Sequence, residues 1–297
     1  MSALLGNPMV TTAALPLVLG MAMALLERFA LPASSLALSL IWAALLLFFY
    51  WDTLGPPVVP PVAASQKLIY LAVAAILIGL LPERLLSTPG VLVAAALAAA
   101  LLWLGWRRLA GGSLDPQMIA ALVTGLLATV GVAMLLSLKA LPSPPVEDPF
   151  LAPAAMLAMC LAGAIISVLG ASIVTGQLLG SLAALAGGWC LVQYIAVLRG
   201  GTAAAWSKGA EMILVYAAAT VLIQMALLAP KANPVALVLS PLPLIVAALV
   251  PGPLRRLVPG IRPLRPLVAG LLIAIPAMLA ILTAIVRAPH GAALGFS

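Results

Sequence analysis

The stretch VLVAAALAAALLWLGW, residues 91–106, decides the fold class. It holds no charged residue and no alternation of apolar with polar side chains. A strand of a membrane β-barrel alternates lipid-facing apolar with lumen-facing polar residues, whereas a membrane helix is a continuous apolar run. In lipid every backbone group must be satisfied within the protein, which only helices and closed barrels achieve. Residues 91–106 therefore predict a membrane helix.

The composition extends this interpretation to the whole chain. Hydrophobic residues make up 65% of the sequence and charged residues 7%, so the chain lacks the side chains for a water-facing surface. We expect one integral membrane domain over 1–297, with 1–140 and 150–297 as halves. The net charge of +7 comes from cations between apolar runs, which is typical of topology anchoring and does not indicate nucleic-acid binding.

Charges and Pro/Gly clusters divide the sequence into apolar segments with short connections. The predicted fold is an all-α polytopic membrane bundle of about ten transmembrane helices. The ten segments are 8–26, 31–51, 68–82, 89–106, 117–138, 150–173, 177–198, 210–229, 235–250 and 267–286. The third and ninth are short for a span of about 20 residues, so nine to eleven helices remain open.

A duplication is a further hypothesis about these segments. Paired arginines follow the fourth segment at 107–108 and the ninth at 255–256, half a chain length later. Pro82 and Pro230, and Lys139 and Arg287, have the same spacing. Five helices per half would make the two halves an inverted repeat, an arrangement found in transporters.

The loop PGPLRRLVPGIRPLRP, 251–266, decides the predicted orientation. The connections on the same side of the membrane as this loop hold nine Lys and Arg residues, and those on the other side hold five. The side with more cations is expected to be cytoplasmic. Without this loop the count is five to five. Both termini are then outside a cell membrane, either inner or plasma membrane. The four arginines are also expected to attract anionic lipid headgroups. They are Arg255, Arg256, Arg262 and Arg265.

Enzyme chemistry finds little support in the sequence. The single histidine, His290, lies in the C-terminal tail, and no phosphate-cradling, metal-binding or nucleophile motif occurs. We expect no catalytic residue, no metal and no cofactor. Glu27 and Arg28 are interpreted as an interfacial pair at a segment end, and Trp206 as an anchor at the headgroups.

The uncharged region 150–198 carries the packing hypothesis. Small residues let helices approach closely in lipid. We therefore predict two tightly packed helices joined by a short turn near 172–177. The packing positions are Gly170, Gly176, Gly180 and Gly187.

Hydroxyl and amide groups within the segments are the candidate substrate ligands. No ionisable side chain is expected near the centre of a segment, so recognition would rest on neutral groups sharing one cavity. These residues are Ser172, Thr175, Gln177, Gln193, Gln224 and Ser240. Each could instead bond a neighbouring helix.

Two functions follow from these patterns. The first is a transporter or facilitator of small or lipid-like solutes without a proton-coupling carboxylate in the membrane. The second is a non-catalytic integral subunit or scaffold of a larger membrane complex, recruiting partners through the small-residue faces of 150–198.

Overall fold

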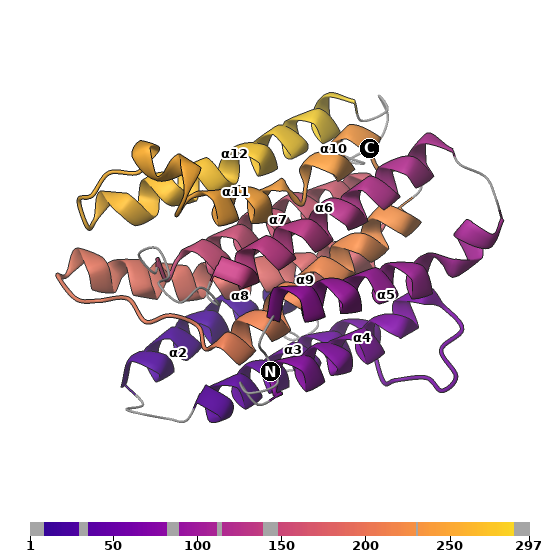
Figure 1. Ribbon diagram of the computed structural model, residues 1–297. Helices are drawn as coiled ribbons and strands as arrows, with labels where there is room; N and C mark the ends of the chain where they lie inside the picture. The colour runs from indigo at the N-terminus through magenta and orange to yellow at the C-terminus, as the bar shows by residue number, and fades with distance from the viewer. Residues whose placement is uncertain are drawn as a thin grey trace.

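The computed structural model describes residues 9–29, 35–81, 89–111, 115–138, 148–229 and 231–287. All regular structure in these ranges is helical. The elements are η1 Val10–Ala14, α2 Leu15–Phe29, α3 Ser35–Leu54, α4 Ala64–Gly79, α5 Pro89–Ala110, α6 Pro116–Leu138, α7 Leu151–Leu169, α8 Ile173–Leu198, α9 Lys208–Leu228, α10 Pro234–Leu239, α11 Leu242–Leu249, η3 Pro253–Leu257 and α12 Leu264–Val286. Figure 1 shows them as one elongated bundle.

The predicted all-helical fold is confirmed for the described residues. Each of the ten apolar segments coincides with a helix or a helix pair, and boundaries shift by no more than about one turn. Within the described ranges, eight helices are long and apolar enough to cross a membrane, which suggests a multi-pass membrane protein in contact with lipid. Ala64–Gly79 and Pro234–Leu249 are apolar but shorter. Ten spans therefore remain a prediction.

The ninth segment is broken in the middle. Its first part, α10, is capped by Asn233, whose side-chain oxygen accepts hydrogen bonds from the N–H groups of residues 235 and 236. The helix stops at Ser240, and α11 starts after Pro241. Proline lacks the N–H that would continue the helical ladder, which explains the interruption.

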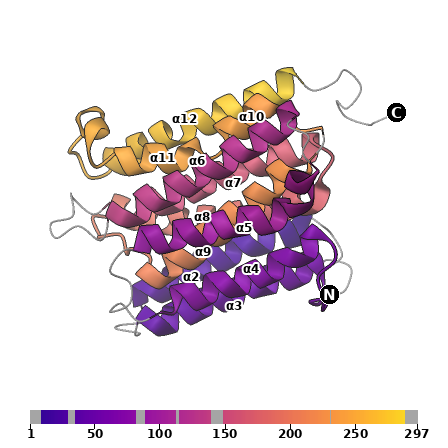
Figure 2. The ribbon, with the colours of Figure 1, turned by 45° about the vertical axis from the view of Figure 1, so that its right-hand side comes forward.

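Helix α9 forms the core of the bundle. It packs against α3, α4, α5, α6, α7 and α8. Every residue from 210 to 227 is buried. Figures 1 and 2 show α2, α3 and α4 on one side of α9 and α10, α11 and α12 on the other.

The expected inverted repeat is not confirmed by the packing. In such a repeat α4 would be the counterpart of α9. Helix α4 packs chiefly against α3, α5 and α9, whereas α9 is surrounded on all sides. Among the landmarks of the duplication, Pro82, Lys139 and Pro230 lie outside the described residues.

The chain alternates between two ends of the bundle, which we name by one residue each. The Glu27 end contains the end of α2 and of α8 and the start of α7, α9 and α12. The Arg108 end contains the end of α5, α7, α9 and α12.

Candidate functional site

The predicted ligands Ser172 and Thr175 lie together at the turn between α7 and α8. Thr175 Oγ1 is 2.5 Å from Ser172 Oγ and 2.6 Å from Ser167 Oγ, and Thr175 is 3% exposed. The turn occupies residues 170–172, slightly earlier than predicted, and Gly176 and Gln177 lie within α8. The three hydroxyls satisfy one another, which is the bonding expected of a packed helix hairpin.

The other predicted ligands are placed elsewhere. Gln193 is completely buried near the opposite end of α8, roughly 27 Å from Thr175 by the helical rise. Its amide donates to the carbonyl of Ala24 (3.2 Å) and accepts from the N–H of Ala204 (3.0 Å). Ser240 Oγ donates to the carbonyl of Leu237 within its own turn.

The structure therefore joins Ser172 with Thr175 and does not gather all six residues around one cavity. Gln177 is half-buried on α8. Gln224 is buried on α9, and its Oε1 has no hydrogen-bond partner among the described residues. Substrate binding by these six residues remains a prediction. Their positions in this conformation do not support a single shared binding cavity.

The glycines of 150–198 differ in what they touch. A Cβ at Gly176 would lie 3.0 Å from Val168 of α7, one at Gly187 would contact Leu157, and one at Gly170 would meet Ala232. A Cβ at Gly180 would meet no atom within 4 Å, so this glycine makes no close helix contact. The packing role predicted for Gly180 is therefore not supported by a contact within the described residues.

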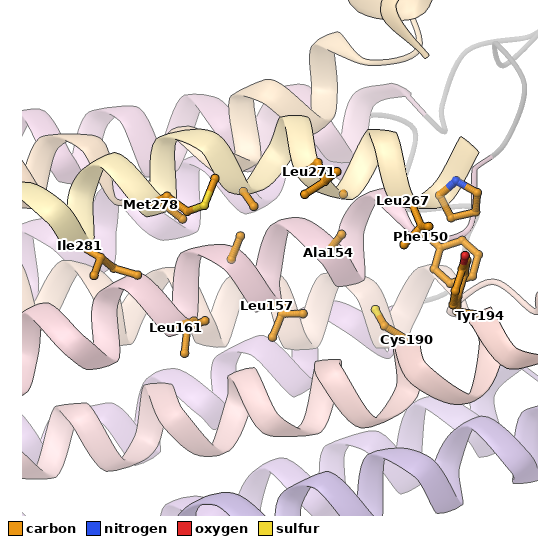
Figure 3. A pocket seen from close by; sticks show the side chains of 15 residues that line it. Phe150, Ala154, Leu157, Leu161, Cys190, Tyr194, Leu267, Leu271, Met278 and Ile281 are labelled. Carbon is orange, nitrogen blue, oxygen red and sulfur yellow. The ribbon is translucent and has the colours of Figure 1, made fainter. Parts of the chain in front are cut away.

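An apolar cavity lies between α7, α8 and α12 and has a volume of about 370 Å³. Figure 3 shows the side chains of these three helices around it. The lining is apolar apart from Tyr194 and Cys190 of α8. It extends along α12 from Pro266 to Ile281. The residues are Phe150, Ala154, Leu157, Ala158, Leu161, Cys190, Tyr194, Pro266, Leu267, Gly270, Leu271, Ala274, Ala277, Met278 and Ile281.

A second cavity of about 270 Å³ adjoins the apolar one at the Glu27 end. The two cavities share Phe150 and Pro266 in their linings. The second cavity contains Asp148, Arg262 and Arg265, together with residues of the loop after α8. Two of the four arginines of 251–266 thus line a cavity, while Arg255 and Arg256 are exposed in η3.

Asp148 organises the charged cavity. Its Oδ1 accepts a hydrogen bond from the N–H of Phe150 (3.2 Å), at the start of α7. Its Oδ2 lies 3.3 Å from Nε of Arg265, and the Asp148 side chain is only 4% exposed. A buried carboxylate needs such compensation. The ion pair therefore places the Arg265 guanidinium beside Asp148 at the start of α12, although Asp148 Oδ2 accepts no hydrogen bond from the described residues.

A third group of polar residues was not predicted from the sequence. Glu27 does not act as a simple interfacial residue: its two carboxylate oxygens accept hydrogen bonds from Nε1 of Trp42 (2.8 Å) and Nε1 of Trp189 (2.6 Å). Trp206 packs against both indoles with ring centroids at 5.7 and 5.5 Å. It is 3% exposed, so its predicted role as a headgroup anchor is wrong.

The sequence offered one signal for this group. Glu27 is a carboxylate in the last turn of an apolar helix, where intramembrane carboxylates face protein. Nothing in the sequence indicated that indoles from α3 and α8 would reach it, because these contacts link residues far apart in the chain.

Comparison of the chain with protein-family models, with curated proteins and with solved structures finds no match. The class of protein is therefore set by the fold alone: a helical bundle whose long apolar helices are compatible with a multi-pass membrane protein.

Proposed function

We propose that this chain is a carrier or facilitator for lipid-like solutes in a cell membrane, inner or plasma. The observation that carries the proposal is the pair of adjoining cavities, one apolar along α12 and one charged at the Glu27 end. Their order matches an amphipathic molecule with a polar head and an apolar tail. The proposal assigns no catalytic step and no cofactor to the chain.

The position of the apolar cavity supports a solute that arrives from the bilayer. Helix α12 carries exposed apolar side chains, including Leu271, Ile275 and Leu282, along its length. The cavity between α12 and α7 therefore lies beside a surface suited to lipid. A lipid-like molecule could enter it without crossing water.

The broken ninth segment supports movement of the solute. Helices α10 and α11 both pack against α12, and α12 lines the apolar cavity. Asn233 at the start of α10 donates to the carbonyl of Thr283 of α12 (3.2 Å). Discontinuous helices beside the binding site are a feature of membrane transporters, in which they permit one part of the bundle to move against another.

The alternative function, an integral subunit of a larger complex, rests on the scarcity of polar side chains, the short loops and the small-residue faces of 150–198. Gly170, Gly176 and Gly187 contact residues of the same chain, so these positions serve internal packing. This arrangement favours the carrier over the subunit.

Transbilayer movement of a fluorescent phospholipid in proteoliposomes tests the proposal. The decisive variant is Gly270→Leu, because Gly270 lines the apolar cavity and a Cβ there meets no atom within 4 Å. The leucine side chain would begin in open space and take up part of the cavity. Gly180→Leu is the matched control, since Gly180 is equally open and lies outside the cavity lining.

We expect the protein to accelerate lipid movement over protein-free liposomes, Gly270→Leu to abolish most of the acceleration, and Gly180→Leu to keep it. No acceleration by the wild-type protein would reject a carrier. Copurification with stoichiometric membrane subunits in mild detergent, together with that result, would favour the alternative.

A further inference from the structure

We infer that the charged cavity binds the phosphate of one anionic phospholipid whose acyl chain occupies the apolar cavity. This inference rests on the proposed function and names its substrate class. It begins from the three charged side chains that line the same cavity, Asp148, Arg262 and Arg265.

The charge balance of the cavity favours an anion. Two guanidinium groups and one carboxylate leave one net positive charge. Asp148 already pairs with Arg265, so Arg262 supplies the uncompensated charge. A phosphodiester carries one negative charge and matches it. A zwitterionic headgroup would add a second cation beside Arg262, which is unfavourable.

The chemistry of Arg265 also fits a phosphate. Its Nε lies 3.3 Å from Asp148 Oδ2, an ion-pair distance without hydrogen-bond geometry, so the N–H groups of the guanidinium are not taken up by Asp148. Guanidinium groups bind phosphate oxygens through two parallel N–H donors, a geometry that an ammonium cannot supply. The ion pair keeps the guanidinium near the cavity, and Thr202 in the same lining carries a hydroxyl, a further donor type for a phosphate oxygen.

The depth of the two cavities fits a lipid rather than a soluble phosphate. The charged cavity lies at the start of α7 and α12, two helices that are long and apolar enough to cross a membrane. The apolar lining continues along α12 from Pro266 to Ile281, roughly 22 Å by the helical rise. Half of a bilayer's hydrocarbon core is about 15 Å thick, so an acyl chain can extend fully in the cavity.

Native mass spectrometry of the detergent-purified protein tests the assignment, with phosphatidylglycerol and phosphatidylcholine titrated separately. Arg262→Gln is the variant, because Arg262 is exposed and its loss leaves no buried charge unpaired. Arg256→Gln is the matched control: it removes the same charge from the same loop outside the cavity.

We expect phosphatidylglycerol to bind more tightly than phosphatidylcholine. Arg262→Gln should weaken phosphatidylglycerol binding by at least about tenfold, the factor for one charge-assisted hydrogen bond, and Arg256→Gln should not. Inorganic phosphate at millimolar concentration should not displace the lipid. Displacement by phosphate would show a soluble anion site and overturn the assignment.

Gly270→Leu separates this inference from the proposed function. If both lipids bind equally and Gly270→Leu weakens both, the apolar cavity holds a lipid but the anionic headgroup is wrong. If Gly270→Leu changes neither, the cavity does not hold a lipid, and the proposed function fails together with this inference.

Discussion

Trp189 Nε1 donates a hydrogen bond of 2.6 Å to Glu27 Oε2, although the two residues are 162 positions apart in the chain. The bond joins α8 to the last turn of α2, and Trp42 joins α3 to the same carboxylate. An indole has a single N–H donor, and a carboxylate offers two acceptor oxygens. The Glu27 end of the bundle is thus held together by one acidic side chain and two aromatic ones.

Replacing Glu27 with glutamine should lower stability. An amide keeps one acceptor oxygen and places an NH₂ group against the other indole, which then loses its partner. The expected loss is about 1–3 kcal/mol, measured as thermal unfolding in detergent by tryptophan fluorescence. Asp52→Asn is the control, because Asp52 is an exposed carboxylate. Equal small shifts for both variants would contradict the structural role of Glu27.

The residues that follow α7 and α8 have the same backbone conformation but differ in type, so exchanging alanine and glycine there should have opposite effects on stability. Both helices end in a Schellman motif, with Ser172 N–H bonded to Ser167 O in the first and Gly201 N–H to Ala196 O in the second. The left-handed residue is Ala171 (φ 63°) in the first and Gly200 (φ 79°) in the second.

An alanine at such a position is strained relative to glycine. Ala171→Gly should therefore raise the free energy of unfolding. The net gain is several tenths to about 1 kcal/mol, because the entropy that glycine adds to the unfolded chain offsets part of the relieved strain. Gly200→Ala should lower it by about 1 kcal/mol. Chemical or thermal unfolding of the two variants checks the signs, and two shifts in the same direction would show that backbone strain does not decide them.

Helices α2 and α8 approach most closely at their glycines. A Cβ at Gly188 would overlap the carbonyl oxygen of Leu17, and one at Gly20 would overlap that of Leu185. Gly188→Ala should destabilise by about 1–3 kcal/mol through overpacking. Gly180→Ala, at an open helical position, should be neutral or stabilising by up to about 1 kcal/mol. Comparable losses for the two in a detergent melt would argue against the α2–α8 contact.

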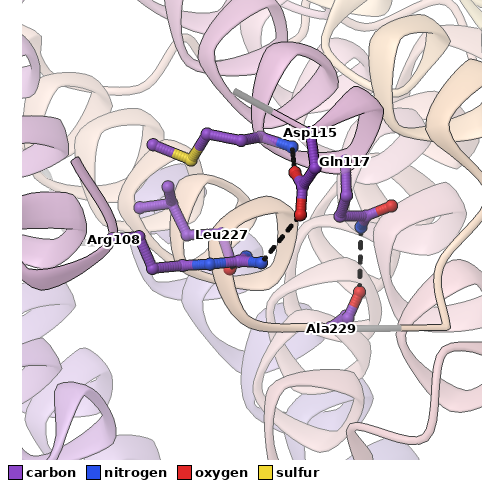
Figure 4. A network of polar contacts seen from close by, with 6 residues as sticks. Arg108, Asp115, Gln117, Leu227 and Ala229 are labelled. Carbon is purple, nitrogen blue, oxygen red and sulfur yellow. Dashed lines mark hydrogen bonds and ion pairs between the residues drawn. The ribbon is translucent and has the colours of Figure 1, made fainter. Parts of the chain in front are cut away.

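At the Arg108 end, an arginine completes the last turn of α9. Arg108 Nη1 donates to the carbonyl of Leu227, and Nη2 lies 3.9 Å from Asp115 Oδ2 (Figure 4). Gln117 donates to the carbonyl of Ala229 in the same region (3.0 Å). Side chains that bond these carbonyls supply the partners that the end of a helix lacks.

Arg108→Met should therefore cost about 1–2 kcal/mol, because the carbonyl of Leu227 loses its donor. Arg107→Met removes the same charge from an exposed neighbour and should cost little. Thermal unfolding of the pair distinguishes a bond to α9 from a general charge effect, which would move both variants equally.

The structure also sharpens the orientation hypothesis. At the Arg108 end, Lys67 and Arg108 donate to the backbone carbonyls of Trp103 and Leu227. These two of the five cations on that side are therefore explained by hydrogen bonds within the fold, and they carry less weight in the charge count. We therefore still expect 251–266 to face the cytoplasm. In a background without Cys160 and Cys190, an impermeant thiol reagent added outside cells should label Val59→Cys, which lies at the Arg108 end, and not Gly260→Cys. The reverse labelling would invert the topology.

Helix identity was predictable because it is a local property. Residues 91–106 are apolar throughout, and a helix is the structure in which such a segment satisfies its own backbone hydrogen bonds in lipid. The ends of the helices follow from the positions of Pro, Gly and charged residues. The break at Ser240–Pro241 is equally local, since proline removes a donor wherever it stands. The sequence therefore determined the ten helical segments and their approximate ends.

Only the tertiary structure decided which helix faces are inside. Apolar residues cover every face of these helices, and lipid is as apolar as leucine, so composition cannot distinguish a lipid-facing side from a buried one. This is why Gly180 turned out open while Gly188 touches Leu17, and why α9 became the centre. The meeting of Asp148 with Arg265, and of Glu27 with two indoles, depends on contacts between segments far apart in the chain, which the linear order of residues does not contain.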